Sequence, residues 1–305
     1  MVSGVAAPAV SVVVPTFNRA RLLPEVLRSV RAQRACPSFE IVVVDDASTD
    51  DTATVLAAEP DVRAVRRPRN GGVARARQTG VEHSRGALLA FHDSDDLMLA
   101  DRLGSLARFL EAHPEVDAVY ANGLAETESG RPCGAVVPAV LARRLDGRPF
   151  GVREIVCDGL PVFLQAALIR RAALDAAGGI DVTLRRHADL ELTCRLALTG
   201  RAVFLDVPVF RYRLHGANQT RDRLALREGM VAVMRRLRER HPSVPAELGE
   251  RWYRERERRH LYRIAWRHWM AAWLHAHPRE LVVAGGALRQ ALALHFPPVP
   301  PARGR

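Results

Sequence analysis

The chain of 305 residues contains no lysine, so its 45 basic residues are all arginine. With 34 acidic residues the formal net charge is +11, which alone would suggest a nucleic-acid partner. The missing lysine indicates a compositional bias toward arginine instead. Aromatic residues make up only 6% of the chain and do not alternate with the arginines, as they do where single-stranded bases stack. We therefore expect no nucleic-acid partner.

Cysteine and long apolar runs are scarce as well. The four cysteines include no Cys-x-x-Cys pair, which argues against common zinc and redox motifs and gives no reason to expect disulfides. No run approaches the ~18 apolar residues of a membrane span. The apolar stretch before Val14 is interrupted by Pro8 and follows no basic segment, so it fits a first strand better than a signal peptide. We expect a soluble, cytoplasmic protein.

The first 120 residues alternate regularly between short apolar runs and helical patterns. The runs predict strands over residues 11–14, 41–44, 62–65, 87–91 and 116–120. Helical spacing of apolar residues lies between them, most clearly over 22–30, 73–84 and 102–110. Strands separated by helices predict an α/β fold, with a Rossmann-like, mostly parallel sheet and helices on both faces.

The second part of the chain is less regular. From residue 121 to about 161 we expect loops and short strands. The elements predicted next are helices over 165–176 and 189–198, and strands over 202–204 and 209–212. Beyond Thr220 the pattern becomes one of long, arginine-rich helices, which contain all four tryptophans: Trp252, Trp266, Trp269 and Trp273.

Carboxylates gather directly after two of the predicted strands. Asp45 and Asp46 follow one, and the cluster Asp93-Ser94-Asp95-Asp96 follows another. In parallel sheets, ligands bind at the carboxyl ends of the strands. Clustered carboxylates repel one another unless a cation or hydrogen bonds compensate them, and oxygen ligands suit Mg²⁺ or Mn²⁺, which can bridge substrate phosphates. A solvated loop is the more frequent meaning of such a cluster alone, but its place after a buried strand favours a metal site.

Three residues near these strand ends allow two interpretations each. Asp46 is either a turn residue or an acceptor for the N–H of a nucleobase or a ribose hydroxyl. Phe17 is either a core aromatic or a platform on which a base stacks. Arg77, in the helix after Asn70-Gly71-Gly72, lies either on a solvated face or near a phosphate.

Two residues further along the chain also allow two interpretations each. Asp189, which with Glu191 opens a predicted helix, is either a cap or a general base that takes a proton from an acceptor hydroxyl. His215 is either a surface residue or a ligand.

Four segments, in this order and spacing, resemble the family-2 glycosyltransferases of the GT-A fold. They are Val12-Val13-Val14-Pro15-Thr16-Phe17-Asn18-Arg19, Glu40-Ile41-Val42-Val43-Val44-Asp45-Asp46-Ala47-Ser48-Thr49-Asp50, Asn70-Gly71-Gly72-Val73-Ala74-Arg75-Ala76-Arg77 and Phe91-His92-Asp93-Ser94-Asp95-Asp96. The resemblance covers roughly residues 10 to 215. It implies an inverting hexosyl transfer, in which an acceptor hydroxyl attacks the anomeric carbon in line as a nucleoside diphosphate, UDP by default, leaves. It also implies a role in the synthesis of cell-surface polysaccharides or glycoconjugates.

The resemblance implies a role for each matching residue. Those around the donor nucleotide are Pro15, Thr16, Phe17, Asn18, Asp46, Arg77, Asp93 and Ser94. A divalent cation, Mn²⁺ or Mg²⁺, would be held by Asp95, Asp96 and His215, with Asp93 and Asp95 as the Asp-x-Asp motif. Asp189 would be the catalytic base. Two departures from the family stand out: Ala188 replaces the Glu that often precedes the base, and Phe17 replaces a Tyr.

The expected organisation follows from this. Residues 1–120 form the donor-binding half, 121–220 the acceptor-side half of the same GT-A domain, and 221–305 a helical C-terminal extension. The expected partners are a nucleotide sugar and a glycan or lipid-linked acceptor. The arginine- and tryptophan-rich extension could lie on the anionic inner face of a membrane, or pack on the catalytic domain or a partner protein.

Three alternative functions fit the sequence less well. A nucleotidyltransferase needs a glycine- and arginine-rich loop after the first strand, where Pro15-Thr16-Phe17-Asn18 stands instead. A dinucleotide-dependent oxidoreductase needs Gly-x-Gly-x-x-Gly after a strand, which is missing there. A non-catalytic GT-A-like protein that binds nucleotide sugars or acts as a scaffold has no need of the complete acidic set, but stays the main alternative.

Overall fold

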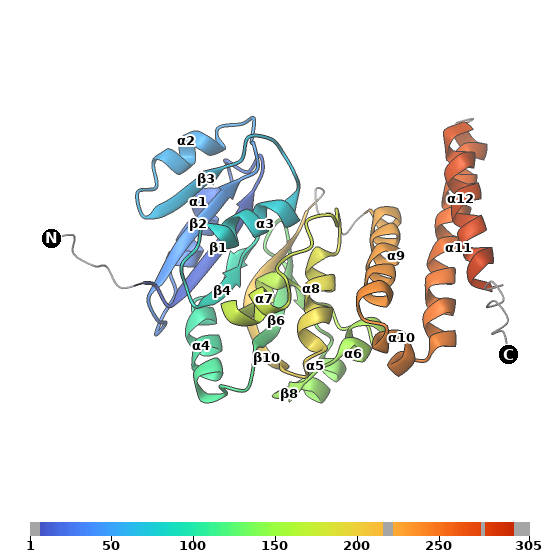
Figure 1. Cartoon of the computed structure of the whole chain (residues 1–305). Helices are drawn as coiled ribbons and strands as arrows, with labels where there is room; N and C mark the ends of the chain where they lie inside the picture. Colours follow the sequence, from blue (N-terminus) through green and yellow to red (C-terminus); the bar gives the residue numbers. More distant parts are fainter. Residues whose placement is uncertain (1–6, 216–221, 276–277, 296–305) are drawn as a thin grey trace. The chain divides into compact units, whose positions relative to one another are not determined.

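The computed structural model describes residues 7–215, 222–275 and 278–295 (Figure 1). The chain divides into two compact units, residues 1–218 and 219–305, which we describe separately. The first unit is built on a ten-stranded mixed sheet, and the second is helical. None of the helices in the described part of the chain is long and apolar enough to cross a membrane.

The sheet is mostly parallel, with one reversed strand in its middle. Its strands lie side by side in the order β3 (Val62–Arg66), β2 (Phe39–Asp45), β1 (Val10–Thr16), β4 (Leu88–Phe91), β9 (Ala167–Arg170), β6 (Ala118–Thr127), β10 (Ala202–Leu214) and β5 (Leu97–Met98). The short strands β7 (Pro132–Ala135) and β8 (Arg148–Pro149) pair with β6 and β10. β9 is antiparallel to both β4 and β6, so β1, β2, β4 and β10 all end at the same edge.

Helices cover both faces of the parallel part, as predicted. Ile41 and Val43 of β2 belong to the core beneath α1 (Leu23–Arg31) and α4 (Arg102–Ala112). Val42 and Val44 point to the other face, where they pack against Ala76 of α3 (Val73–Glu82). Because successive side chains of a strand point to opposite faces, a strand covered on both sides needs apolar residues at every position. This explains the unbroken Ile-Val-Val-Val run.

Glycines allow α3 to lie close to the sheet and to begin where it does. A Cβ at Gly80 would lie 2.3 Å from Cγ1 of Val13 in β1, so a larger residue would push the helix away. Gly72, directly before the helix, has a φ of 85°, which L-residues rarely adopt. The loop between β2 and α3 contains the short helix α2 (Thr52–Ala57) and β3.

The second half of the unit corrects three predictions. Residues 121–161 were expected to form loops and short strands, but they also include the helices α5 (Ala139–Leu145) and α6 (Val152–Val156). The helix predicted over 165–176 is wrong in its first part: Leu164–Ala166 forms a 3₁₀ turn and Ala167–Arg170 forms β9, and only α7 (Arg171–Ala176) is helical. β9 pairs with neighbours on both sides, which outweighs the helix propensity of its alanine and leucine. The two strands predicted near residues 202 and 212 are one irregular strand, β10. The next helix along the chain is α8 (Ala188–Ala197).

The second unit contains α9 (Arg223–Arg240), α10 (Ser243–Leu248), α11 (Glu250–His275) and α12 (Pro278–His295). Leu261, Ile264 and Ala265 of α11 form its core together with Ala287 and Ala291 of α12. Buried polar groups add to it: the Tyr253 hydroxyl donates to the Met234 carbonyl at 2.5 Å, and Glu257 receives Arg235 and Arg238 at 2.7 and 2.9 Å. The arginine-rich helices predicted beyond Thr220 are therefore confirmed.

Candidate functional site

The loops that follow β1 and β2 are joined at the carboxyl edge of the sheet. Pro15 and Thr16 end β1. Two hydrogen bonds join this loop to the loop after β2. Asn18 N donates to Ser48 Oγ at 2.9 Å, and Thr49 N donates to Asn18 Oδ1 at 2.8 Å. Between Thr16 and Asn18 the side chain of Phe17 is exposed (41%). A core role for Phe17 is thus excluded, and its ring is accessible to a flat ligand.

Asp46 joins the end of β2 to the start of α3. Its carboxylate is buried and accepts the backbone N–H groups of Gly72 at 2.7 Å and of Gly71 at 3.1 Å, and it pairs with the Arg67 guanidinium. A Cβ at Gly71 would lie 2.5 Å from Nη1 of Arg67, and Gly72 has a left-handed φ of 85°, so both positions favour glycine. The contact of Asp46 with a nucleobase or ribose stays a prediction.

Arg77 lies buried beside the acidic cluster. Its Nη2 donates to Asp93 Oδ1 at 2.6 Å. Burial alone would lower the pKa of Arg77, but the carboxylates of Asp93, Asp189 and Asp95 outweigh it and raise the pKa. The predicted donor residues Asp93 and Arg77 are therefore in contact, and the field of the predicted base Asp189 reaches the same guanidinium. The neighbouring Ser94 is buried.

Asp95 and His215 meet although 120 positions separate them in the chain. His215 Nε2 lies 3.3 Å from Asp95 Oδ2, and Arg19 Nη2 lies 3.4 Å from the same oxygen. His215 follows β10 and Asp95 follows β4, so the shared edge of the sheet brings them together. The solvated-loop interpretation of the cluster does not account for this meeting.

Asp96 is surrounded differently from its neighbour Asp95. It is buried, its Oδ2 accepts from Gln165 Nε2 at 2.6 Å, and its Oδ1 accepts from the backbone N–H of Arg213 at 2.8 Å. Burial raises the pKa of Asp96 to about 8. Both oxygens of this predicted metal ligand are therefore engaged by protein groups. Neither Gln165 nor Arg213 was predicted as a site residue, and only the closeness of Arg213 to His215 in the sequence could have indicated one of them.

His92 supports the cluster from inside the core. Its Nε2 lies 3.2 Å from the backbone oxygen of Asp96, and its Nδ1 lies 3.4 Å from Nη1 of Arg102. Arg102 also donates to the carbonyls of Phe91 and Ala167. Since Nδ1 faces a cation, the ring is neutral with its proton on Nε2. Burial and the charge of Arg102 accordingly lower the pKa of His92 to about 3, and burial lowers that of Arg102 to about 9.

Asp189 lies in the first turn of α8, on the helix and not at its cap. The N-cap residue is His187, with a left-handed φ of 59°. Oδ1 of Asp189 accepts from the backbone N–H of Leu190 at 2.9 Å, and its backbone oxygen accepts from Thr193 Oγ1 at 2.7 Å. The hydroxyl of the buried Tyr120 lies 2.9 Å from the same Thr193 oxygen and links α8 to β6.

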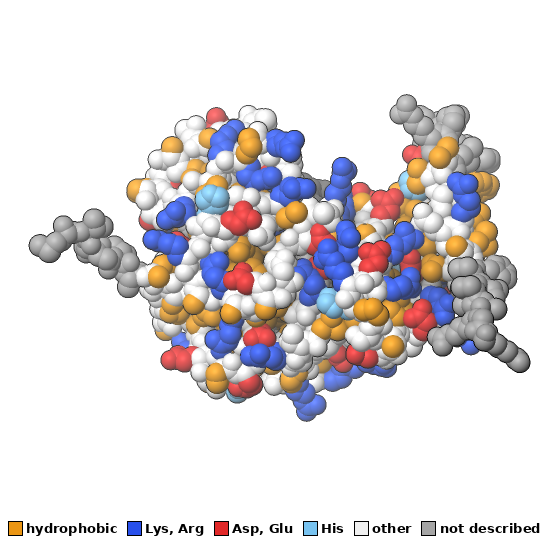
Figure 2. Space-filling model, in the orientation of Figure 1, with side chains coloured by type: hydrophobic (Ala, Val, Ile, Leu, Met, Phe, Trp, Pro, Cys, Tyr) orange, Lys and Arg blue, Asp and Glu red, His pale blue; other side chains and the backbone are white. Residues whose placement is uncertain are grey.

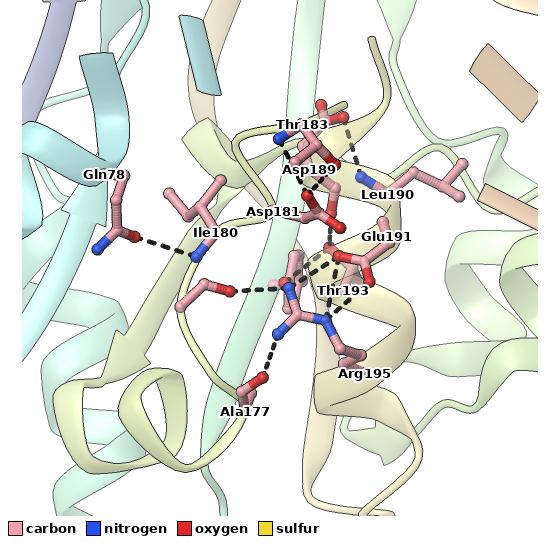
Figure 3. Close-up of polar contacts among 12 residues, drawn as sticks. Gln78, Ala177, Ile180, Asp181, Thr183, Asp189, Leu190, Glu191, Thr193 and Arg195 are labelled. Carbon is pink, nitrogen blue, oxygen red and sulfur yellow. Dashed lines mark hydrogen bonds and ion pairs between the residues drawn. The ribbon is translucent and has the colours of Figure 1, made fainter. Parts of the chain in front are cut away.

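A buried ion pair fixes α8 to the loop before it (Figure 3). Arg195 donates to Glu191 at 2.7 to 3.0 Å, one helical turn away, and to the carbonyls of Gly179, at 2.8 Å, and Ala177. The same loop is held from α3, because Ile180 N donates to Gln78 Oε1 at 3.1 Å. Glu191 and Arg195 were not predicted as supporting residues, although an acidic and a basic residue four positions apart on a helix are a local signal for a pair.

A metal site is only partly provided by these side chains. Within residues 7–215, 222–275 and 278–295, no three His, Cys, Asp or Glu side chains gather as a complete metal-binding set. Asp95 and His215 offer two ligands on one side. This fits Mg²⁺ or Mn²⁺, which commonly take one or two protein ligands and complete their shells with water and substrate phosphates.

Comparison with known sequences identifies relatives of the first unit. The family model described as glycosyl transferase family 2 matches residues 11–172. A glycosyltransferase of PGL/p-HBAD biosynthesis from Mycobacterium bovis is 37% identical over 195 residues, which are 62% of this chain and 70% of that protein. The uncharacterized protein y4gI of Sinorhizobium fredii is 35% identical over 189 residues, but the match spans 58% of this chain and only 20% of that much longer protein.

Comparison with solved structures shows the fold. S. aureus TarS, residues 1–349, matches 93% of this chain with a TM-score of 0.65 and 20% sequence identity, and the match covers 80% of that structure. The mannosyltransferase PcManGT of Pyrobaculum calidifontis, solved with GDP-Man and Mn²⁺, matches 95% of this chain and 88% of its own with a TM-score of 0.59. The sheet and the helices that cover it therefore have the GT-A fold, and further helices follow at the C-terminal side.

Proposed function

The chain belongs to glycosyl transferase family 2, and we propose that it moves a hexose from a metal-bound nucleoside-diphosphate sugar to an acceptor hydroxyl with inversion. The observation that carries this proposal is the meeting of Asp95, after β4, with His215, after β10, at 3.3 Å. Next to it, the buried Arg77 pairs with Asp93 and feels the charge of Asp189. Donor-side carboxylates and the base thus surround one region at the strand ends.

The donor nucleotide occupies the edge formed by β1, β2 and β4. Pro15, Thr16, Phe17 and Asn18 supply one wall, in which the exposed ring of Phe17 stacks on the base. Asp46 accepts a hydrogen bond from the nucleoside, Asp93 and Ser94 contact the ribose, and Arg77 contacts the diphosphate. UDP is our first choice of nucleotide: TarS has been solved with UDP and with UDP-GlcNAc, whereas PcManGT has been solved with GDP-Man.

Asp95 and His215 would hold the divalent cation, Mn²⁺ or Mg²⁺. When bound, such an ion neutralises the charge that develops on the departing diphosphate. Asp96, the third predicted ligand, could reach the ion only by giving up its hydrogen bond to Gln165 or to Arg213. We therefore propose that Asp96 mainly fixes the end of β10, so that His215 stays beside Asp95.

Asp189 acts as the general base. It takes the proton of the acceptor hydroxyl while the oxygen forms a bond to the anomeric carbon, and the bond from that carbon to the diphosphate oxygen breaks. The electron pair leaves with the nucleoside diphosphate, and attack from the opposite side inverts the anomeric centre. The Glu191–Arg195 pair and Thr193 position α8 and thereby the carboxylate.

The acceptor is the least specified partner. We propose a glycan or a lipid-linked saccharide of cell-surface polysaccharide or glycoconjugate synthesis, and the printed name of the M. bovis relative is consistent with a glycoconjugate. Buried Ala188 provides no polar group beside the base. For a lipid-linked acceptor we place the reaction in the cytoplasm, at the inner membrane face.

Binding of UDP with Mn²⁺, measured by calorimetry, tests the donor site. Asp95→Ala removes one of two proposed metal ligands, and we expect the Mn²⁺-dependent part of the UDP affinity to disappear. Glu111→Ala, on the exposed side of α4, is the matched control and should bind as the wild type does. Unchanged affinity in Asp95→Ala would overturn the metal assignment. Binding without release of UDP from any nucleotide sugar would instead favour the non-catalytic alternative.

A further inference from the structure

The helical unit carries nearly all of the net charge of the chain. Residues 219–305 contain 18 arginines and 8 acidic residues, a net charge of +10, whereas residues 1–218 contain 27 arginines and 26 acidic residues, a net charge of +1. Figure 2 shows that acidic and basic side chains are interspersed over the visible face of the first unit. The excess is therefore a property of the helical unit and not of the chain as a whole.

The arginines of the helical unit fall into two groups along the sequence. Up to residue 259 they are largely paired with glutamates: Arg254 with Glu250, Arg258 and Arg259 with Glu255, and Arg235 and Arg238 of α9 with Glu257. From residue 260 to 305 the sequence has one acidic residue, Glu280, against six arginines. Arg263, Arg267 and Arg289 are exposed and make no hydrogen bond or ion pair within the part of the chain that the structure describes. These three are available to an anionic partner.

Large apolar side chains lie exposed on both helices, and those of α11 are next to Arg263 and Arg267 in the sequence. On α11 they are Tyr262 (37% exposed), Trp266 (63%) and Trp269 (46%), spaced so that they share one side of the helix, with the two indole rings 5.5 Å apart. On α12 they are Val282, Val283, Leu288 and Leu292. The hairpin core is formed by other residues, among them Leu261, Ile264 and Ala287, so packing of the hairpin does not require the exposed ones.

We propose that this exposed surface of α11, defined by Tyr262, Trp266 and Trp269 with Arg263 and Arg267, docks on a lipid bilayer that contains anionic headgroups. Indole rings favour the boundary between headgroups and acyl chains, and guanidinium groups bind lipid phosphates. A second copy of the chain is a poor occupant, because two units of charge +10 repel each other. The contact is peripheral, since neither helix has the apolar length to span a bilayer.

The wild-type chain offers a direct test, because all four tryptophans lie in α11 and their fluorescence reports on this helix alone. With vesicles of phosphatidylcholine and phosphatidylglycerol we expect a blue shift and quenching by brominated acyl chains. The effect should be weaker at 1 M salt, where the Debye length falls to about 3 Å. With pure phosphatidylcholine both signals should be small. No change with the anionic vesicles, or an equal change with both kinds, would overturn the proposal.

Co-sedimentation of full-length variants locates the surface. Each arginine near an anionic surface is worth about fivefold in partitioning, so Arg263→Gln with Arg267→Gln should lower it by about 30-fold. Trp266→Ala with Trp269→Ala should lower it at both salt concentrations. Arg143→Gln with Arg148→Gln is the matched control: it removes two exposed arginines from the first unit and should keep vesicle binding within about threefold.

Other outcomes contradict the proposal. An equal loss in the Arg143 and Arg148 control would mean that net charge alone attracts the chain. Self-association that disappears in the Trp266 and Trp269 variant would identify a second copy as the occupant. Tighter binding to duplex DNA than to the anionic vesicles would identify nucleic acid. Helicity measured by circular dichroism verifies that each variant is folded, and none of these measurements depends on the proposed sugar transfer.

Discussion

The loop after β4 and the first turns of α8 lie far apart in the sequence but use their carboxylates in the same way. In each, one carboxylate is buried and held by several donors: Asp96 by Gln165 and Arg213, and Glu191 by Arg195. In each, a second carboxylate nearby is more accessible: Asp95, beside His215, and Asp189, in the first turn of its helix. Position in the fold therefore divides acidic residues into those that support and those that are free to react.

This division predicts two different kinds of defect. Removing a buried carboxylate leaves its donors without a partner in a medium of low polarity, which costs stability. Removing an accessible one changes few contacts of the folded chain, so activity falls while stability stays. One variant of each kind in the same region therefore tests whether buried and accessible carboxylates differ in this way.

The largest effect is expected from Asp189→Asn. Asparagine keeps the shape of the side chain but cannot take a proton, and loss of a general base lowers turnover by roughly 10²- to 10⁴-fold. UDP affinity with Mn²⁺ and the melting temperature should stay at wild-type values, which calorimetry measures. Turnover near the wild-type rate would show that another group is the base, and a large fall in melting temperature would place Asp189 among the supporting carboxylates.

The carboxylates could be predicted from the sequence, but the groups that hold the buried Asp96 could not. Asp93 to Asp96 and Asp189 follow local patterns, the end of an apolar run and the start of a helix, so their places could be predicted. The partners of Asp96 lie 69 and 117 positions away, on a 3₁₀ turn and on β10. Gln165 was predicted to lie in a helix, because Leu-Gln-Ala-Ala-Leu has high helix propensity, whereas pairing of β9 with two strands is a property of the whole sheet.

A second, comparable effect is expected from Glu191→Gln, on stability. The change leaves the Arg195 guanidinium, 6% exposed, without its counter-charge, which costs about 3–5 kcal/mol. For a unit of this size we expect the melting temperature to fall by about 10 °C. Asp61→Asn is the matched control in the same unit: its carboxylate pairs with Arg31 but is 52% exposed, so about 0–1 kcal/mol should be lost. Equal losses in both variants would contradict the division.

The smallest effect, and the most specific, is expected from His92→Gln. In the folded chain the pKa of His92 is about 3, below its ordinary value of 6.5. As the pH falls from 6.5 toward 3, only the unfolded chain takes up this proton. The free energy of unfolding therefore decreases over that pH range. By pH 5.5 the loss reaches about 1.4 kcal/mol. Glutamine can still accept from Arg102 and donate to the Asp96 carbonyl, but it does not titrate.

The contribution of His92 is isolated by comparing how the free energy of unfolding depends on pH in the wild type and in His92→Gln. Other groups titrate over the same range, and the raised pKa of Asp96, about 8, gives a slope of the opposite sign. Urea unfolding at pH 7.5 and 5.5 should therefore show a wild type that weakens by about 1.4 kcal/mol relative to the variant. If the free energy of unfolding changed equally with pH in both proteins, His92 would already be charged beside Arg102 in the folded chain. A charged ring would then support the acidic cluster. This would contradict the neutral tautomer that the contacts with Arg102 and the Asp96 carbonyl require.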